Sequence, residues 1–74
     1  MEEQRQFRID FHPHVSADDI AKYFMILKSN GSVTQGGDER TVLLNTESDK
    51  AAAWIREVLS RWERAGTCHW RQLS

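Results

Sequence analysis

Three histidines and a single cysteine are the residues of this chain whose types could bind a metal ion. His12 and His14 flank Pro13, and Cys68 and His69 are neighbours further along the sequence. Imidazole nitrogen and thiolate sulfur are ligands that zinc prefers. If the two segments are antiparallel neighbours in a sheet, all four side chains gather at one corner.

The spacing of Cys68 and His69 weakens this zinc hypothesis. Adjacent residues of a strand point to opposite faces, so both could bind one ion only across a bulge. A lone Cys is most often a small buried hydrophobic residue, and Cys68 is expected to point into the core. We therefore assign no metal ligand and no cofactor. Whether His12, His14, Cys68 and His69 form a metal site stays open at this stage.

Signals for catalysis are weaker still. The sequence contains no P-loop, no dinucleotide-binding glycine motif and no metalloprotease or nucleophile-elbow motif. No pair of carboxylates has a defined spacing across a cleft, and nothing indicates that Cys68 is an activated nucleophile. We assign no catalytic residue and predict that the protein is not an enzyme.

Length and charge restrict the class of protein further. The chain has 74 residues, with ten Lys and Arg against eleven Asp and Glu and a formal net charge of −1. Such a chain forms one domain with a thin core. Balanced charge disfavours a general nucleic-acid binder. No apolar run approaches the ~20 residues that span a bilayer, and no signal-peptide pattern opens the sequence. We expect a cytoplasmic protein with no membrane partner, whose thiol stays reduced.

Alternating and helical patterns of apolar residues divide the chain into six elements. Ser16, with Asp19 three residues later, is typical of a helix start. Asn30-Gly31 is expected to end that helix in a left-handed conformation, and Gly36-Gly37 is expected to form a two-residue hairpin turn. The expected strands are 6–12, 32–35, 40–45 and 67–73, the expected helices are 16–29 and 49–65, and residues 1–5 are expected to be disordered before a single domain over 6–74.

Two helices with one apolar face each, and a sheet with one apolar face, bury each other in a two-layer α/β sandwich. The order β-α-β-β-α-β resembles the ferredoxin-like sandwich, a split βαβ arrangement. We expect the first and third strands to be central and parallel, with the last strand beside the first and the second at the other edge. The residues expected to face the helices are Phe7, Ile9, Phe11, Val42, Leu44, Cys68 and Trp70. This resemblance implies an architecture and no function.

Two functions found among proteins of this shape do not fit the residues. Heavy-metal chaperones need two cysteines after the first strand, where this chain has His12-Pro13-His14-Val15. RNA-recognition modules stack bases on exposed aromatic side chains of the central strands, where this chain has Arg8, Asp10, Thr41 and Leu43. Residues 50–74 carry five basic and two acidic side chains, but the arginines are spread around the second helix, so nucleic-acid binding is only an alternative.

Apolar side chains outside the expected core favour protein binding. Met25 and Ile26 lie off the apolar stripe of the first helix, Leu43 is expected on the open face of the sheet with Val33 nearby, and Trp54 lies at the margin of the second helix's stripe. Interface cores favour Met and aromatic residues, and small domains often gain stability by oligomerising. We predict a small non-enzymatic protein-interaction or regulatory module, an adaptor or inhibitor of a larger protein, which could also form a homodimer. The alternatives are a nucleic-acid accessory protein and a small-ligand or metal-binding module.

Overall fold

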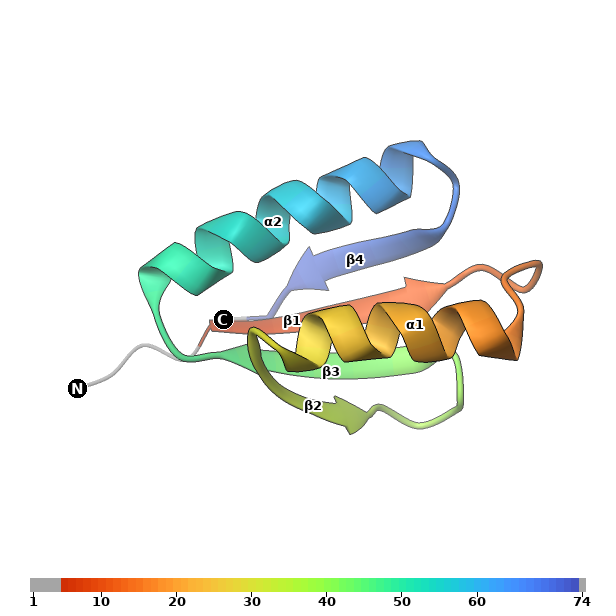
Figure 1. The fold of residues 1–74 in the computed structure, drawn as a ribbon, viewed down its shortest axis with the longest axis horizontal. Coiled ribbons are helices and arrows are strands. Elements are labelled where there is room, and N and C mark those ends of the chain that lie inside the picture. The colour runs from red at the N-terminus through yellow and green to blue at the C-terminus, as the bar shows by residue number, and fades with distance from the viewer. Residues whose placement is uncertain (1–4, 74) are drawn as a thin grey trace.

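The structure, a computed structural model, describes residues 5–73 of the chain and contains all six expected elements (Figure 1). The expected segment of disorder falls on residues 1–4, outside the described residues, and on Arg5, which is the first residue of a strand. Neither helix in the described part of the chain is long and apolar enough to cross a membrane. The elements are β1 Arg5–Phe11, α1 Ala17–Lys28, β2 Gly31–Gln35, β3 Thr41–Thr46, α2 Asp49–Arg64 and β4 Cys68–Gln72.

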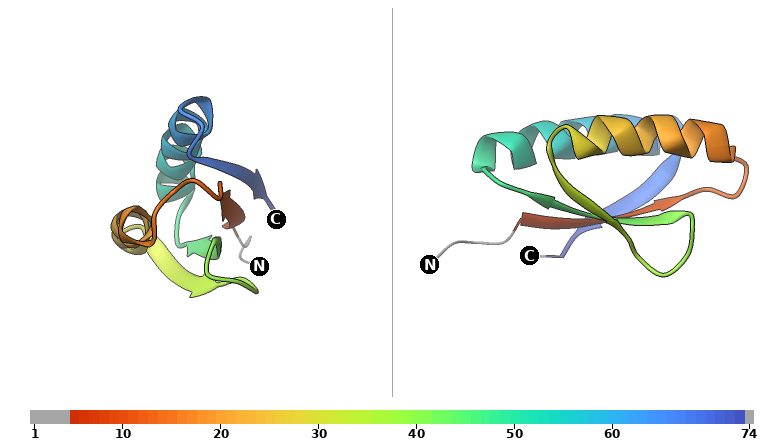
Figure 2. Two further views of the ribbon diagram at one scale, coloured as in Figure 1. Left: turned by 90° about the vertical axis from the view of Figure 1, so that its right-hand side faces the viewer. Right: turned by 60° about the horizontal axis from the view of Figure 1, so that its bottom comes forward.

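Both helices cover one face of a four-stranded antiparallel sheet with strand order β2-β3-β1-β4 (Figures 1 and 2). The fold is the expected ferredoxin-like sandwich. The expectation that β1 and β3 are parallel was wrong, because they pair antiparallel with Ile9 opposite Val42. The crossover through α1 joins β1 to β2, which therefore run in the same direction. β3 is the hairpin partner of β2 and lies between them, so it is antiparallel to both.

Serine side chains begin both helices, and the first of them is the expected Ser16. Ser16 Oγ accepts a hydrogen bond from the backbone N–H of Asp19, and Ser48 Oγ accepts one from Ala51. Each bond supplies an acceptor for an N–H group of the first turn that has no partner within its helix. After α2, Gly66 has a φ of +78°, which is the left-handed helix stop expected of glycine.

The end of α1 differs from the expectation. Neither Asn30 nor Gly31 has a positive φ. Instead, the side chains of Ser29 and Asn30 both donate hydrogen bonds to the carbonyl oxygen of Ile26, which satisfies a carbonyl of the last helical turn. Gly31 is then the first residue of β2. A Cβ at Gly31 would lie 2.1 Å from the backbone oxygen of Asn45, so the close approach of two strands requires a glycine here.

The connection between β2 and β3 is also longer than a two-residue turn. It spans residues 36–40, and of its two glycines only Gly37 has a positive φ, at +114°. The Asp38 carboxylate accepts a hydrogen bond from the backbone N–H of Arg40 at 2.8 Å. This bond is the main reason that the pKa of Asp38 lies below its ordinary value.

The core lies between the sheet and the helices. The expected inward residues are buried there, except Trp70, which packs against the core but is only partly buried. Ala52, which the helical pattern did not single out, is 1% exposed. Three aromatic rings connect β1 and both helices: the Phe11 and Tyr23 centroids are 5.6 Å apart, and those of Tyr23 and Trp62 are 4.6 Å apart. The buried apolar residues are Phe7, Ile9, Phe11, Val15, Ile20, Leu27, Val42, Leu44, Ala52, Ile55, Leu59 and Cys68.

Arg40 ties the start of β3 to the loop between β1 and α1. Its Nη1 donates hydrogen bonds to the carbonyl oxygens of His12, at 2.9 Å, and Val15, at 2.7 Å. Backbone carbonyl groups that are shielded from water need a hydrogen-bond donor from the protein. Sequence patterns gave Arg40 no role, because both of its acceptors are backbone atoms distant in sequence.

Replacing Arg40 by Met should lower the free energy of unfolding by about 2 kcal/mol, since two part-buried carbonyl groups lose a charged donor. Arg64→Met is the matched control: this exposed arginine lies in the last turn of α2, and its loss should cost less than about 0.5 kcal/mol. Urea denaturation of both variants measures the difference. Equal losses would show that the two hydrogen bonds contribute nothing to stability.

Candidate functional site

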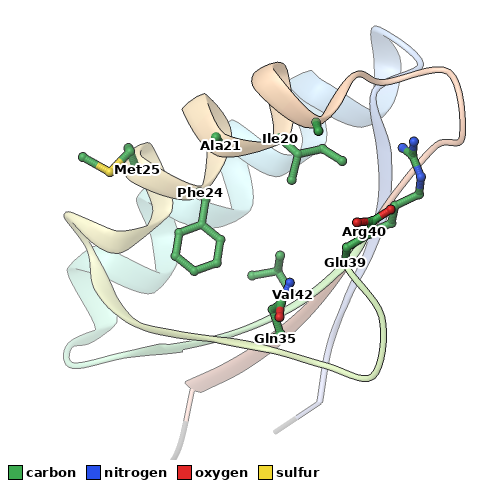
Figure 3. A pocket seen from close by; sticks show the side chains of 9 residues that line it. Ile20, Ala21, Phe24, Met25, Gln35, Glu39, Arg40 and Val42 are labelled. Atoms are coloured by element: carbon green, nitrogen blue, oxygen red, sulfur yellow. The ribbon is translucent and has the colours of Figure 1, made fainter.

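An apolar hollow on the surface is a groove between α1 and the β2–β3 side of the sheet (Figure 3). Its volume is about 380 Å³, near the lower end of the range for small-molecule pockets. Phe24 points from α1 toward Val42 and Gln35, while Met25 lies at the outer side of the groove (Figure 3). Glu39 and Arg40 line one end of it. We call this hollow the α1–β2 groove.

The groove lies beside an open edge of the sheet, formed by β2 (Figure 1). The ladder between β2 and β3 continues into the hairpin loop, where the N–H of Gly36 donates to the carbonyl of Thr41. In an antiparallel pair such hydrogen-bonded positions alternate with positions whose N–H and C=O point the other way. Given the register of β2 and β3, the outward-pointing groups belong to Gly31, Val33 and Gln35.

The β2 edge lacks the features that protect most edge strands from pairing. Charged side chains, prolines and bulges are the usual protection, and β2 has the sequence Gly-Ser-Val-Thr-Gln. The opposite edge strand, β4, contains His69 and Arg71. The α1–β2 groove and the β2 edge are therefore adjacent features, one apolar and one with unpaired backbone groups.

Met25 and Ile26 are both exposed, at 67% and 41%, but they do not form one patch. Met25 lines the α1–β2 groove, and Ile26 is not among its lining residues. Consecutive helical residues point about 100° apart, so the two side chains project from different flanks of α1.

Leu43 and Trp54 lie on two further surfaces. Leu43 is in register with Arg8 on one side and Thr34 on the other, on the sheet face that the helices leave open. Trp54 is 44% exposed and lines a shallow hollow with Asn30 and Lys50. Of the four side chains predicted to form an interface, only Met25 belongs to the α1–β2 groove.

Val33, expected near Leu43, instead faces the helices. It is opposite Leu44 in the sheet and packs against the buried core. The strand register therefore corrects the assignment of Val33 to the open face and places its side chain on the same face as the α1–β2 groove.

The three histidines do gather at one corner. The antiparallel pairing of β1 and β4 brings His69 beside the end of β1, and His12 and His14 follow that strand end in the sequence. The ring centroids of His12 and His14 are 5.7 Å apart, and those of His12 and His69 are 4.7 Å apart. The rings of His12 and His14 are stacked, with an interplanar angle of 12°, so they present their faces to each other. His69 Nδ1 lies 3.3 Å from Glu63 Oε2. Within residues 5–73, no group of three His, Cys, Asp or Glu is arranged to hold a metal ion.

Cys68 has the environment of a core residue. It is 0% exposed, and it faces the helices as the strand pattern predicts. Burial, reinforced by the carboxylates of Glu63 and Asp10, raises the pKa of the thiol from 9.0 to about 12. A thiol held in its neutral form is a poor nucleophile and a poor metal ligand, so Cys68 does not join the histidine corner.

The open face of the sheet is polar and carries no Phe, Tyr or Trp on the described strands. Its central row is Thr34, Leu43, Arg8 and Arg71. Arg8 is also paired with Asp10, at 3.2 Å. This face offers phosphate-binding charge but no ring on which a base could stack.

Comparison with protein families, with curated proteins and with solved structures gave no match. Function is therefore inferred from the geometry of this chain alone.

Proposed function

We propose that this chain is a small non-enzymatic protein-interaction module, acting as an adaptor or inhibitor, and that it binds protein through the α1–β2 groove and the β2 edge. The observation that carries the proposal is Met25: a side chain 67% exposed at an apolar groove beside an edge strand without charge. We further propose that it acts in the cytoplasm, where its single thiol stays reduced.

The two parts of this surface support different aspects of binding. An extended segment added to a sheet edge gains affinity from backbone hydrogen bonds, and specificity from pockets that receive alternate side chains. Here Val33 and Gln35 have outward backbone groups, and Phe24 and Met25 line the adjacent apolar groove. Met suits such a surface because its unbranched side chain adapts to different shapes.

The alternatives receive less support from the described residues. A nucleic-acid accessory role would rest on Arg8 and Arg71 of the open face, where base-stacking rings are missing. A metal-binding role would need histidine nitrogens that converge, but the rings of His12 and His14 are stacked. A small apolar ligand would occupy the α1–β2 groove itself, and it would then compete with a protein partner.

Photo-crosslinking tests the proposal. When p-benzoylphenylalanine replaces Met25 in cells of the source organism, irradiation should yield covalent adducts with protein. The same probe at Arg64, exposed in α2 and not part of the α1–β2 groove, should yield at least about tenfold less, because a bound partner covers only its own binding surface. Adducts are measured by immunoblotting and mass spectrometry. Equal yields at both positions would contradict the assignment of the groove as a binding surface.

A further inference from the structure

We infer that the partner at the β2 edge is a second copy of this chain, with the two β2 strands paired antiparallel about Val33. This inference rests on the proposed function and names the partner of the same surface. The resulting dimer has one continuous eight-stranded sheet, twice the four strands of one chain, with all helices on the same face.

The first support is the symmetry of the outward backbone groups. They belong to Gly31, Val33 and Gln35, which are spaced evenly about Val33. When a second copy is placed antiparallel about this residue, Val33 lies opposite Val33, and Gly31 opposite Gln35 in both directions. Each of these pairs exchanges two hydrogen bonds. Every outward N–H and C=O of β2 then has a partner, and both copies contribute the same residues, as in a closed two-fold interface.

The side chains are compatible with the same register. Directly opposite residues share a face of the sheet, so Gly31 and Gln35 meet on the helix face, where the missing side chain of glycine leaves space for glutamine. On the open face, Ser32 lies opposite Thr34, and both are small hydroxyl residues. No charged residue occurs in β2, so two copies meet without like-charge repulsion.

The second support is the position of Met25. It lies on the flank of α1 that borders the α1–β2 groove, at the outer side of that groove (Figure 3). Strand pairing about Val33 brings the same flank of a second α1 beside it, so each copy covers the other's exposed Met25. Among the large hydrophobic side chains of the described residues, Met25 has the highest exposed fraction. Its burial in the dimer would stabilise the association.

The third support is the contrast with the other edge. β4 carries His69 and Arg71 on its exposed side, and charges of this kind oppose edge pairing. β2 is therefore the edge that favours a second strand. Association through β2 also enlarges the buried core of a domain whose size alone gives only a thin one.

Disulfide capture tests the register directly. In a hydrogen-bonded antiparallel pair the opposite Cα atoms are about 5.5 Å apart, within the range that a disulfide spans. Purified Val33→Cys should therefore form a disulfide-linked dimer under mild oxidation. Thr34→Cys is the matched control: it is the next residue in the strand, lies opposite Ser32 in this register, and should crosslink at least about tenfold more slowly. Buried Cys68 is common to both variants.

Sedimentation of the unmodified chain over a range of concentrations, with Met25→Asp beside it, completes the experiment. A dimer that Met25→Asp dissociates, together with fast crosslinking of Val33→Cys, supports the inference. A chain that stays monomeric, or a dimer in which Val33→Cys is no faster than Thr34→Cys, overturns it. Adducts of Met25 with a different protein would then leave the proposed function standing. If Met25→Asp unfolds, the comparison of disulfide formation in Val33→Cys and Thr34→Cys still supports or overturns the inferred dimer.

Discussion

Cys68 of the folded protein should react with iodoacetamide at least about a thousandfold more slowly than Cys68 of the unfolded chain. The thiolate is the reacting form. Burial, with Glu63 and Asp10 nearby, raises the pKa of this thiol from 9.0 to about 12. Near pH 8 this change lowers the thiolate fraction by about a thousandfold. The side chain is also 0% exposed, so reagent reaches it only when the chain opens.

Mass spectrometry of alkylated protein, with and without denaturing urea, measures both rates. The unfolded chain is the internal control, because it contains the same cysteine without its surroundings. Rapid labelling in native buffer would show that Cys68 is accessible. It would also reopen the possibility that this thiol reaches the histidine corner.

The same pKa gives the sign of a pH effect on stability. Because the pKa of Cys68 is higher in the folded state, the folded state keeps a proton that the unfolded state loses above about pH 9. Stability from this residue is complete below pH 9 and falls by up to about 1.4 kcal/mol per pH unit as the pH rises toward 12. The Cys68→Ala variant, compared over the same pH range, shows how much of the decline belongs to other groups.

Local signals in the sequence predicted the elements well. The cap at Ser16 depends on residues within one turn, and alternation along β1 depends only on the period of a strand. Each such signal is contained in a short segment, and the bounds of the helices and strands accordingly lie within one residue of those expected. The ferredoxin-like order follows from these elements.

Features that depend on contacts between distant segments were harder to predict. The direction of β3 relative to β1 depends on which strand the crossover reaches. Arg40 contributes through backbone carbonyls of another loop, which no side-chain pattern reveals. Val33 was assigned to the wrong face because the strand register decides it.

The candidate site shows the same division. The sequence indicated that Met25 and Ile26 lie off the apolar stripe, and both are exposed. It could not show that only Met25 borders the α1–β2 groove, since the groove is formed with Gln35 and Val42 of two strands. The histidine corner was expected from the pairing of β1 and β4, but the stacking of His12 on His14 depends on side-chain orientation in the loop.

Gly31→Ala should be the most destabilising of the single glycine-to-alanine substitutions, with a loss of about 3 kcal/mol in the free energy of unfolding. A Cβ at this position would lie 2.1 Å from the backbone oxygen of Asn45 and 3.2 Å from Leu44 Cδ1. The oxygen belongs to β3, a central strand paired on both sides. It cannot move without disturbing the ladder, so the new methyl group must separate β2 from β3.

Two other glycines separate this steric effect from a conformational one. Gly66 has a φ of +78° and no atom within 4 Å of an added Cβ, so Gly66→Ala should cost only about 1 kcal/mol, from the left-handed backbone. At Gly36 the nearest atom to an added Cβ is Thr41 Cγ2, at 3.0 Å. A side-chain methyl can shift, so Gly36→Ala should also cost less than Gly31→Ala.

Urea denaturation at protein concentrations low enough to exclude dimers would rank the three variants. Gly31 also belongs to the inferred β2–β2 contact, and dilution removes any contribution of that contact to the measured stability. If Gly31→Ala is no less stable than Gly66→Ala, Gly31 does not lie as close to the Asn45 carbonyl group as the structure places it.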